Sequence, residues 1–178
     1  MRRAVFALAA ALMSVAVPAQ ASAACLTSAE AESIALVAMP DLIRQTGQIC
    51  AATLPATSLV RRPQSAFLQR YDAAADAAWP AAKLAVVKLS DPAMEMLLQS
   101  DFARPMLTSL LVPLLVGRIA TNDCGTIDRL VSLLEPLPPR NTAGIVVTTL
   151  QYLKAEKAKG NGAVADVPDL PVCTRGTR

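Results

Sequence analysis

The sequence QSAFLQRYDAAADAAWPAAKLAVVKL, residues 64–89, decides the fold class of this chain. Apolar side chains recur within it every three or four residues, which is the period of a helix buried on one face. They are Phe67, Tyr71, Ala75, Ala78, Ala82, Val86 and Leu89. Because several are alanine, a neighbouring helix can approach this face closely. Pro80 lacks a backbone N–H, so the pattern predicts a kink or a break after Trp79.

Helices are also predicted along the rest of the chain, which is rich in alanine and leucine and has only 7 glycines. Thr27 and Glu30 have the spacing of a capping box, which starts the first helix. That helix is expected to end or kink at Pro40, where a second helix begins and runs to about Thr53. A loop is expected over 54–63, and further helices from Pro92 and over 105–120, 126–134 and 141–159.

The chain is therefore predicted to be all-α, an irregular bundle of about six to seven helices, several of them kinked at proline. One segment competes with this prediction, because Ile145–Thr149 is a run of five β-branched residues that locally favours a strand. We expect helix there, since a lone strand would have no partner. The helices form one domain over residues 24–160, and residues 161–178 form an extended C-terminal tail tethered through Cys173.

Residues 1–23 have the layout of a cleaved secretory signal peptide. Arg2 and Arg3 give a positive start, Ala4–Val17 is apolar, and the small residues at 21–23 precede the expected cut. The apolar part is about 14 residues long, too short to cross a bilayer comfortably. We therefore expect a periplasmic or secreted protein with no transmembrane segment after cleavage.

Cys25 follows the expected cut almost directly, which raises the alternative of a lipid anchor on its thiol. A lipidation site normally has a bulky aliphatic residue three positions before the cysteine, and Ser22 stands there instead. Lipidation would also leave an odd number of thiols, so we expect no anchor. The alanine-rich composition resembles that of small secreted proteins of high-GC Gram-negative bacteria, a likeness that implies no activity.

The four cysteines, Cys25, Cys50, Cys124 and Cys173, all follow the leader and so reach a compartment in which disulfides form. Four cysteines allow three pairings, among which a sequence does not choose. We favour Cys25–Cys50 and Cys124–Cys173, each worth about 3–4 kcal/mol in stability. The first would tie the mature N-terminus to the second helix, and the second would pin the tail. No C-x-x-C spacing occurs, so neither a redox pair nor a metal cluster is indicated.

Composition excludes several classes of function. The chain has no histidine, which rules out Ser-His-Asp and Cys-His catalysis in their usual form and the common histidine-containing zinc sites. The leader holds 2 of the 17 basic residues, so 15 basic and 14 acidic residues leave the mature chain with a net charge of +1. Such a chain, with no basic cluster and 3% aromatic residues, is not expected to bind nucleic acid. No catalytic, metal or cofactor site is predicted.

Arg104 and Arg118 enclose 13 residues rich in leucine and valine. As a helix these would span about 20 Å, short of the roughly 30 Å of a bilayer core, so we expect a buried central helix. Pro113 lies inside it, and one interpretation is that a kink there opens an apolar pocket for a lipid-like ligand. Its expected lining is Trp79, Leu110, Pro113 and Leu114. The favoured interpretation is a core helix whose kink follows packing.

Two polar patterns are interpreted as ordinary surface. Asp72 and Asp76 lie one helical turn apart, but carboxylate pairs perform acid–base chemistry only in a cleft that shifts one pKa. Residues 122–128 collect oxygen atoms without the spacing of a calcium-binding loop, and we expect a turn and a helix start there. Basic residues near enough in sequence to neutralise the aspartates are Arg61, Arg62, Arg70 and Lys83.

Three functions are compatible with this sequence. The favoured one is a non-enzymatic module that binds a protein or peptide, because the usual catalytic residue types are missing; it predicts an exposed apolar patch of several hundred Å². The alternative, a carrier of an apolar small molecule or lipid, predicts an enclosed apolar cavity of a few hundred Å³. The third, an enzyme without histidine, predicts polar groups converging in a cleft.

Overall fold

The computed structural model describes residues 24–165, 167 and 169–173 of the 178-residue chain. The expected leader, residues 1–23, lies outside the described residues. The described chain forms six α-helices: α1 (Ser28–Ile49), α2 (Ala66–Leu89), α3 (Pro92–Leu98), α4 (Ala103–Val116), α5 (Cys124–Leu134) and α6 (Pro139–Ala158). Short 3-10 helices lie between and after them: η1 (Cys50–Ala52), η2 (Leu59–Arg61), η3 (Thr121–Asp123) and η4 (Gly162–Val164).

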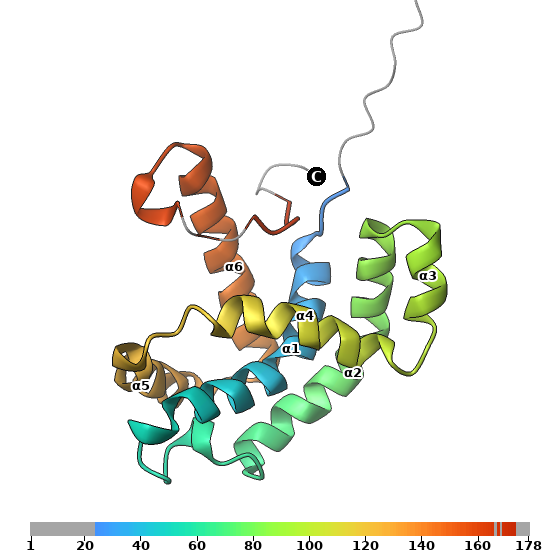
Figure 1. The fold of residues 1–178 in the computed structure, drawn as a ribbon. Coiled ribbons are helices and arrows are strands. Elements are labelled where there is room, and N and C mark those ends of the chain that lie inside the picture. Colours follow the sequence, from blue (N-terminus) through green and yellow to red (C-terminus); the bar gives the residue numbers. More distant parts are fainter. Residues whose placement is uncertain (1–23, 166, 168, 174–178) are drawn as a thin grey trace, which may run out of the picture.

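The prediction of an all-α fold is confirmed, and α1 is its central helix (Figure 1). α2, α4 and α6 all pack directly on α1. The main core joins α1 to α2 through buried side chains whose burial is the principal stabilising term of the fold. These are Leu36, Val37 and Met39 of α1 and Phe67, Leu68 and Tyr71 of α2.

α1 continues through Pro40, where the sequence predicted a kink or a boundary between two helices. A proline inside a helix leaves the carbonyl four residues earlier, that of Leu36, without its usual N–H donor. Pro40 is buried, as are Ala38 and Met39 beside it. The prediction of two helices was wrong because packing around this segment offsets the lost hydrogen bond.

α2 begins at Ser65, whose hydroxyl accepts a hydrogen bond from the Leu68 N–H at 3.3 Å. It continues through Pro80 and bends along its length (Figure 1), in line with the predicted kink. Several of its alanines face the core, where they let the helices approach closely. The buried ones are Ala75, Ala78, Ala82 and Ala85.

The later helices follow the predictions with shifted ends. α4 begins and ends earlier than the predicted 105–120, and α6 begins at Pro139 rather than after a cap at Asn141. The β-branched run lies inside α6, so the expectation of helix there is confirmed. Val147 is buried within it and Thr149 donates its hydroxyl proton to the Ile145 carbonyl at 2.9 Å, which shows how tertiary packing overrides a local strand preference.

Two disulfides are present, as predicted, but the favoured pairing was wrong: the bonds are Cys25–Cys173 and Cys50–Cys124. The reason is the continuity of α1. Its 22 residues place Cys25 and Cys50 about 33 Å apart, at opposite ends of a helix. A disulfide requires its two Cα atoms to lie within about 7 Å. The Cα–Cα distances of the observed pairs are 5.0 and 5.6 Å.

The described part of the tail is held by more than Cys173. Leu26 and Val172 form an isolated parallel bridge, which lays the tail beside the start of α1. Lys154 of α6 donates to the carbonyls of Leu170 and Val172 at 2.9 and 3.0 Å, and Lys157 donates to that of Val167 at 2.8 Å. The start of α1, residues 170–173 and the end of α6 are therefore bound to one another.

The predicted capping box at the start of α1 is confirmed. The Thr27 N–H donates to the Glu30 carboxylate at 2.7 Å, and the Glu30 N–H donates to the Thr27 hydroxyl at 3.3 Å. Lys88 of α2 also pairs with Glu30 at 3.0 Å. The backbone hydrogen bond from Thr27, followed by the contacts with Lys88, holds the pKa of the Glu30 carboxyl below its ordinary value of 4.5.

This lowered pKa predicts how stability depends on pH. Because the folded-state pKa of Glu30 is depressed, its contribution is present above the unfolded-state pKa and is lost as the pH falls through the folded one. We expect Glu30→Gln to lower the free energy of unfolding by about 1 kcal/mol at pH 7 and by much less at pH 3. Urea unfolding at both pH values measures this, and parallel losses at the two would contradict it.

Candidate functional site

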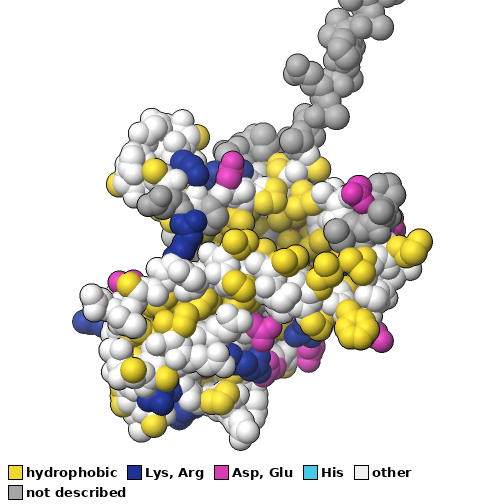
Figure 2. Space-filling model, in the orientation of Figure 1, with side chains coloured by type: hydrophobic (Ala, Val, Ile, Leu, Met, Phe, Trp, Pro, Cys, Tyr) yellow, Lys and Arg dark blue, Asp and Glu magenta, His cyan; other side chains and the backbone are white. Residues whose placement is uncertain are grey.

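Four large apolar side chains stand out from the surface along α4. The exposed fractions are 78% for Phe102, 41% for Met106, 61% for Leu110 and 60% for Leu114. They follow one another every four residues, so they form a row on one side of the helix. Figure 2 shows hydrophobic side chains gathered along α4, which crosses the front of the molecule. We call these four residues the α4 stripe.

The other side of α4 is buried. Val112 and Val116 pack in one cluster with Ala38 of α1 and are almost fully shielded from water. α4 is therefore apolar on both sides, and only one side is buried against the rest of the protein. Soluble monomers rarely expose a contiguous apolar patch of more than a few hundred Å² unless something binds there.

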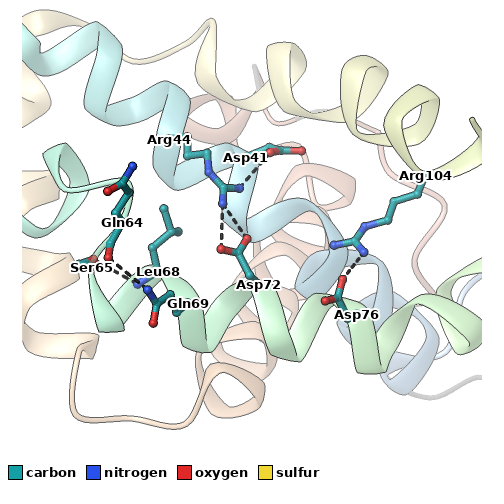
Figure 3. A network of polar contacts seen from close by, with 9 residues as sticks. All are labelled: Asp41, Arg44, Gln64, Ser65, Leu68, Gln69, Asp72, Asp76 and Arg104. Atoms are coloured by element: carbon teal, nitrogen blue, oxygen red, sulfur yellow. Dashed lines mark hydrogen bonds and ion pairs between the residues drawn. The ribbon is translucent and has the colours of Figure 1, made fainter.

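The stripe also lacks charge. Arg104 is the only charged residue between Phe102 and Gly117, and its guanidinium forms an ion pair with Asp76 of α2 (Figure 3). The exposed side of α4 thus carries no free charge over four turns. The other residues exposed on it are Pro105, Ser109, Pro113 and Gly117.

The predicted pocket residues do not surround one cavity. Leu110, Pro113 and Leu114 are exposed on α4, which continues through Pro113, so the expectation of a buried central helix was wrong for this side of α4. Trp79 lies on α2 and lines a separate cleft. The proline leaves α4 helical, and the Gly117 N–H still reaches the Pro113 carbonyl at 2.9 Å. Leu110 and Leu114 therefore lie on the surface of α4 and do not line a cavity with Trp79.

The cleft beside Trp79 has a volume of about 680 Å³ and opens to solvent between α1, α2 and the start of α4. Most of its lining is polar. The lining residues are Asp41, Gln45, Trp79, Lys83, Gln99, Ser100, Asp101, Arg104, Pro105, Thr108 and Ser109.

Asp72 and Asp76 are each paired with an arginine (Figure 3). Arg44 of α1 donates to both carboxylate oxygens of Asp72 at 2.8 Å and to Asp41 at 3.3 Å. Arg104 of α4 pairs with Asp76. These bonds tie α1 and α4 to the polar side of α2, so the two aspartates serve as anchors between helices.

The basic residues expected to neutralise these aspartates were the wrong ones. Arg61 donates to the Leu54 carbonyl at 2.6 Å, and Arg70 donates to the Glu135 carbonyl at 2.8 Å. The sequence did not indicate Arg44 or Arg104, because nothing in one sequence shows which helices pack together.

Residues 122–128 form the end of η3 and the first turn of α5, where the sequence predicted a turn and a helix start. The Asp123 carboxylate accepts the Ala120 N–H at 3.1 Å, and that of Asp128 accepts the Ser58 hydroxyl. Among the described residues no group of three or more acidic or cysteine side chains is arranged to hold a metal ion.

The sequence did not indicate that Phe102 and Met106 lie on the surface or that Gln45 and Gln99 line the cleft. The four-residue spacing of Phe102, Met106, Leu110 and Leu114 was available as a signal. However, a helix that is apolar all round does not reveal which side is buried.

Comparison of the chain with protein families, with curated proteins and with solved structures found no match.

Among the described helices, none is by itself long and apolar enough to cross a membrane. One pair of segments, Ala103–Val116 and Thr121–Leu134, would be long and apolar enough if taken together, and the two are bent by 86° relative to each other.

Proposed function

We propose that this protein is a non-enzymatic binding module that docks a helical segment of a protein partner on the α4 stripe. The observation that carries the proposal is the uncharged, solvent-exposed row from Phe102 to Leu114. A periplasmic or secreted location is part of the proposal. The signal-like residues 1–23 and the two disulfides support it.

The shape of the stripe favours a helix as the partner. Its four side chains span about 18 Å along one helix, a length that matches about three and a half turns of a partner helix. Docked helices are recognised by anchors spaced three or four residues apart, which is the spacing of Phe102, Met106, Leu110 and Leu114. An uncharged surface requires an uncharged face opposite, since burying an unpaired charge costs several kcal/mol.

The charges around the stripe favour a protein over a membrane surface. Helices that lie on membranes carry many lysines and arginines beside their apolar face. α4 contains a single basic residue, Arg104, and it is paired with Asp76.

The two alternative functions, a carrier of an apolar small molecule and an enzyme without histidine, have less support. The large cleft is open and lined mainly by polar side chains, whereas a carrier of apolar molecules calls for an enclosed apolar cavity. The carboxylates of Asp72 and Asp76, which an acid–base mechanism would employ, are bound to arginines.

Binding of a labelled probe peptide tests the proposal. The probe is a net-neutral amphipathic helix of about 18 residues, with leucines on one face and alternating glutamate and lysine on the other. By fluorescence anisotropy we expect saturable binding to the wild type. The double variant Leu110→Asp/Leu114→Asp should bind at least about tenfold more weakly, because each leucine buried in a complex contributes about 1.5–3 kcal/mol.

Leu133→Asp is the matched control, since Leu133 is 67% exposed on α5 and lies outside the stripe. It should bind like the wild type. Equal loss in the control and the double variant would contradict the proposal. So would a wild type that sediments as a dimer while the double variant is monomeric, because the occupant of the stripe would then be a second copy of the chain.

A further inference from the structure

We infer that the cleft beside Trp79 is a binding site for a neutral saccharide of one or two rings. This site borders α4 but includes none of the four residues of the α4 stripe, and the inference does not depend on the proposed function. The cleft volume of about 680 Å³ lies within the range of roughly 300–1,000 Å³ typical of small-molecule sites.

Trp79 supplies the apolar wall of such a site. It is the only tryptophan in the chain, and it packs against the main core while also lining the cleft. One face of a sugar ring consists largely of C–H groups, which stack on the electron-rich face of an indole. A partly exposed tryptophan in the lining of a polar cleft fits this mode of recognition.

Four polar side chains around Trp79 have unused hydrogen-bonding groups. Gln45, Lys83, Gln99 and Asp101 line the cleft, and none has a hydrogen-bond or ion-pair partner within the described part of the chain. An amide both donates and accepts, and a carboxylate accepts through two oxygens. Adjacent hydroxyl groups of a sugar, which donate and accept side by side, match this set.

The charge of the cleft favours a neutral ligand. Asp41 and Arg104 are already paired with Arg44 and Asp76, which leaves Lys83 and Asp101 as one charge of each sign. Such a lining provides no excess positive charge for a phosphate and no excess negative charge for an amine. A peptide would in addition need backbone partners or an apolar groove, and the cleft lining offers mainly side-chain polar groups.

The fluorescence of Trp79 provides a direct test, because no other tryptophan contributes to the signal. Full-length mature protein is titrated separately with maltose, cellobiose and N,N′-diacetylchitobiose. We expect a saturable change in emission with at least one of them, with a Kd on the order of 1 mM or lower. Calorimetry on the same disaccharide gives an affinity that does not depend on the fluorophore.

Variants then locate the site. We expect Gln45→Ala/Gln99→Ala to weaken the binding about tenfold and Trp79→Ala to weaken it at least as much by calorimetry. Gln48→Ala is the matched control on α1, since Gln48 is exposed outside the cleft lining, and it should leave the affinity unchanged. Circular dichroism confirms that each variant is folded.

Three results would overturn the inference. One is the absence of a saturable response to all three disaccharides. Another is a response that the Gln45→Ala/Gln99→Ala variant retains in full. The third is tighter binding of a neutral tripeptide such as Ala-Ala-Ala, capped at both ends, which would assign the cleft to peptides instead.

Discussion

Replacement of Gly47 by alanine is expected to lower the free energy of unfolding by about 3 kcal/mol or more. A Cβ atom at this position of α1 would lie 2.0 Å from the carbonyl oxygen of Val60 and 2.9 Å from its carbonyl carbon. Both belong to backbone, which does not move aside as a flexible side chain does. The clash outweighs the gain of about 1 kcal/mol that alanine normally brings to a helix.

Hydrogen bonds on both sides of Val60 keep its backbone from moving away from a side chain at position 47. Arg61 donates to the Leu54 carbonyl and Ser58 donates to Asp128 of α5, so both sides of η2 are fixed. A fall of roughly 10 °C in the melting temperature is expected for a domain of this size. Gly125→Ala is the matched control, because a Cβ in α5 meets no atom within 4 Å. It should be neutral or slightly stabilising, and a similar loss in both variants would contradict the packing of η2 on α1.

Removal of the Cys50–Cys124 disulfide is the second change with a large expected effect. The bond joins residues that are 74 positions apart. Without it the unfolded chain has more conformational entropy, which lowers the free energy of unfolding by about 4 kcal/mol. Both cysteines are fully buried beside Leu54 and Val60, so the double variant Cys50→Ala/Cys124→Ala also loses packing at the C-terminal end of α1. Urea unfolding under non-reducing conditions measures the difference from the wild type.

The two disulfides should also differ in their access to reductant. Cys25 and Cys173 are partly exposed, whereas Cys50 and Cys124 are fully buried. Mild reductant without denaturant is therefore expected to free the first pair alone, as detected by alkylation and peptide mass mapping. Early alkylation of Cys50 or Cys124, or a Cys25–Cys50 crosslink in the untreated protein, would contradict the structure.

Local signals in the sequence predicted the helices well. The capping box at Thr27 and Glu30 and the apolar period of 64–89 depend only on residues within a few turns of one another. Pro40 and the cysteine pairing were mispredicted for one common reason. Whether a helix survives a proline depends on what packs around it, and the continuity of α1 then determines which cysteines meet.

The candidate sites were less accessible to prediction. The hydrophobic segment between Arg104 and Arg118 was evident, but its burial was expected on all sides. Only the packing of Val112 and Val116 on Ala38 shows that Leu110 and Leu114 face water. The cleft joins residues from four separate elements, and no spacing within the sequence brings these residues together.

Amide hydrogen exchange of the protein with and without the neutral helical probe peptide tests the binding role of α4 most directly. We predict that saturating peptide slows exchange over residues 103–116 and leaves α5 and α6 unchanged, because the α4 stripe is the docking surface. The Leu110→Asp/Leu114→Asp variant should show no such protection. Protection that falls mainly outside α4, or that persists in this variant, would contradict the assignment of α4 as the docking surface.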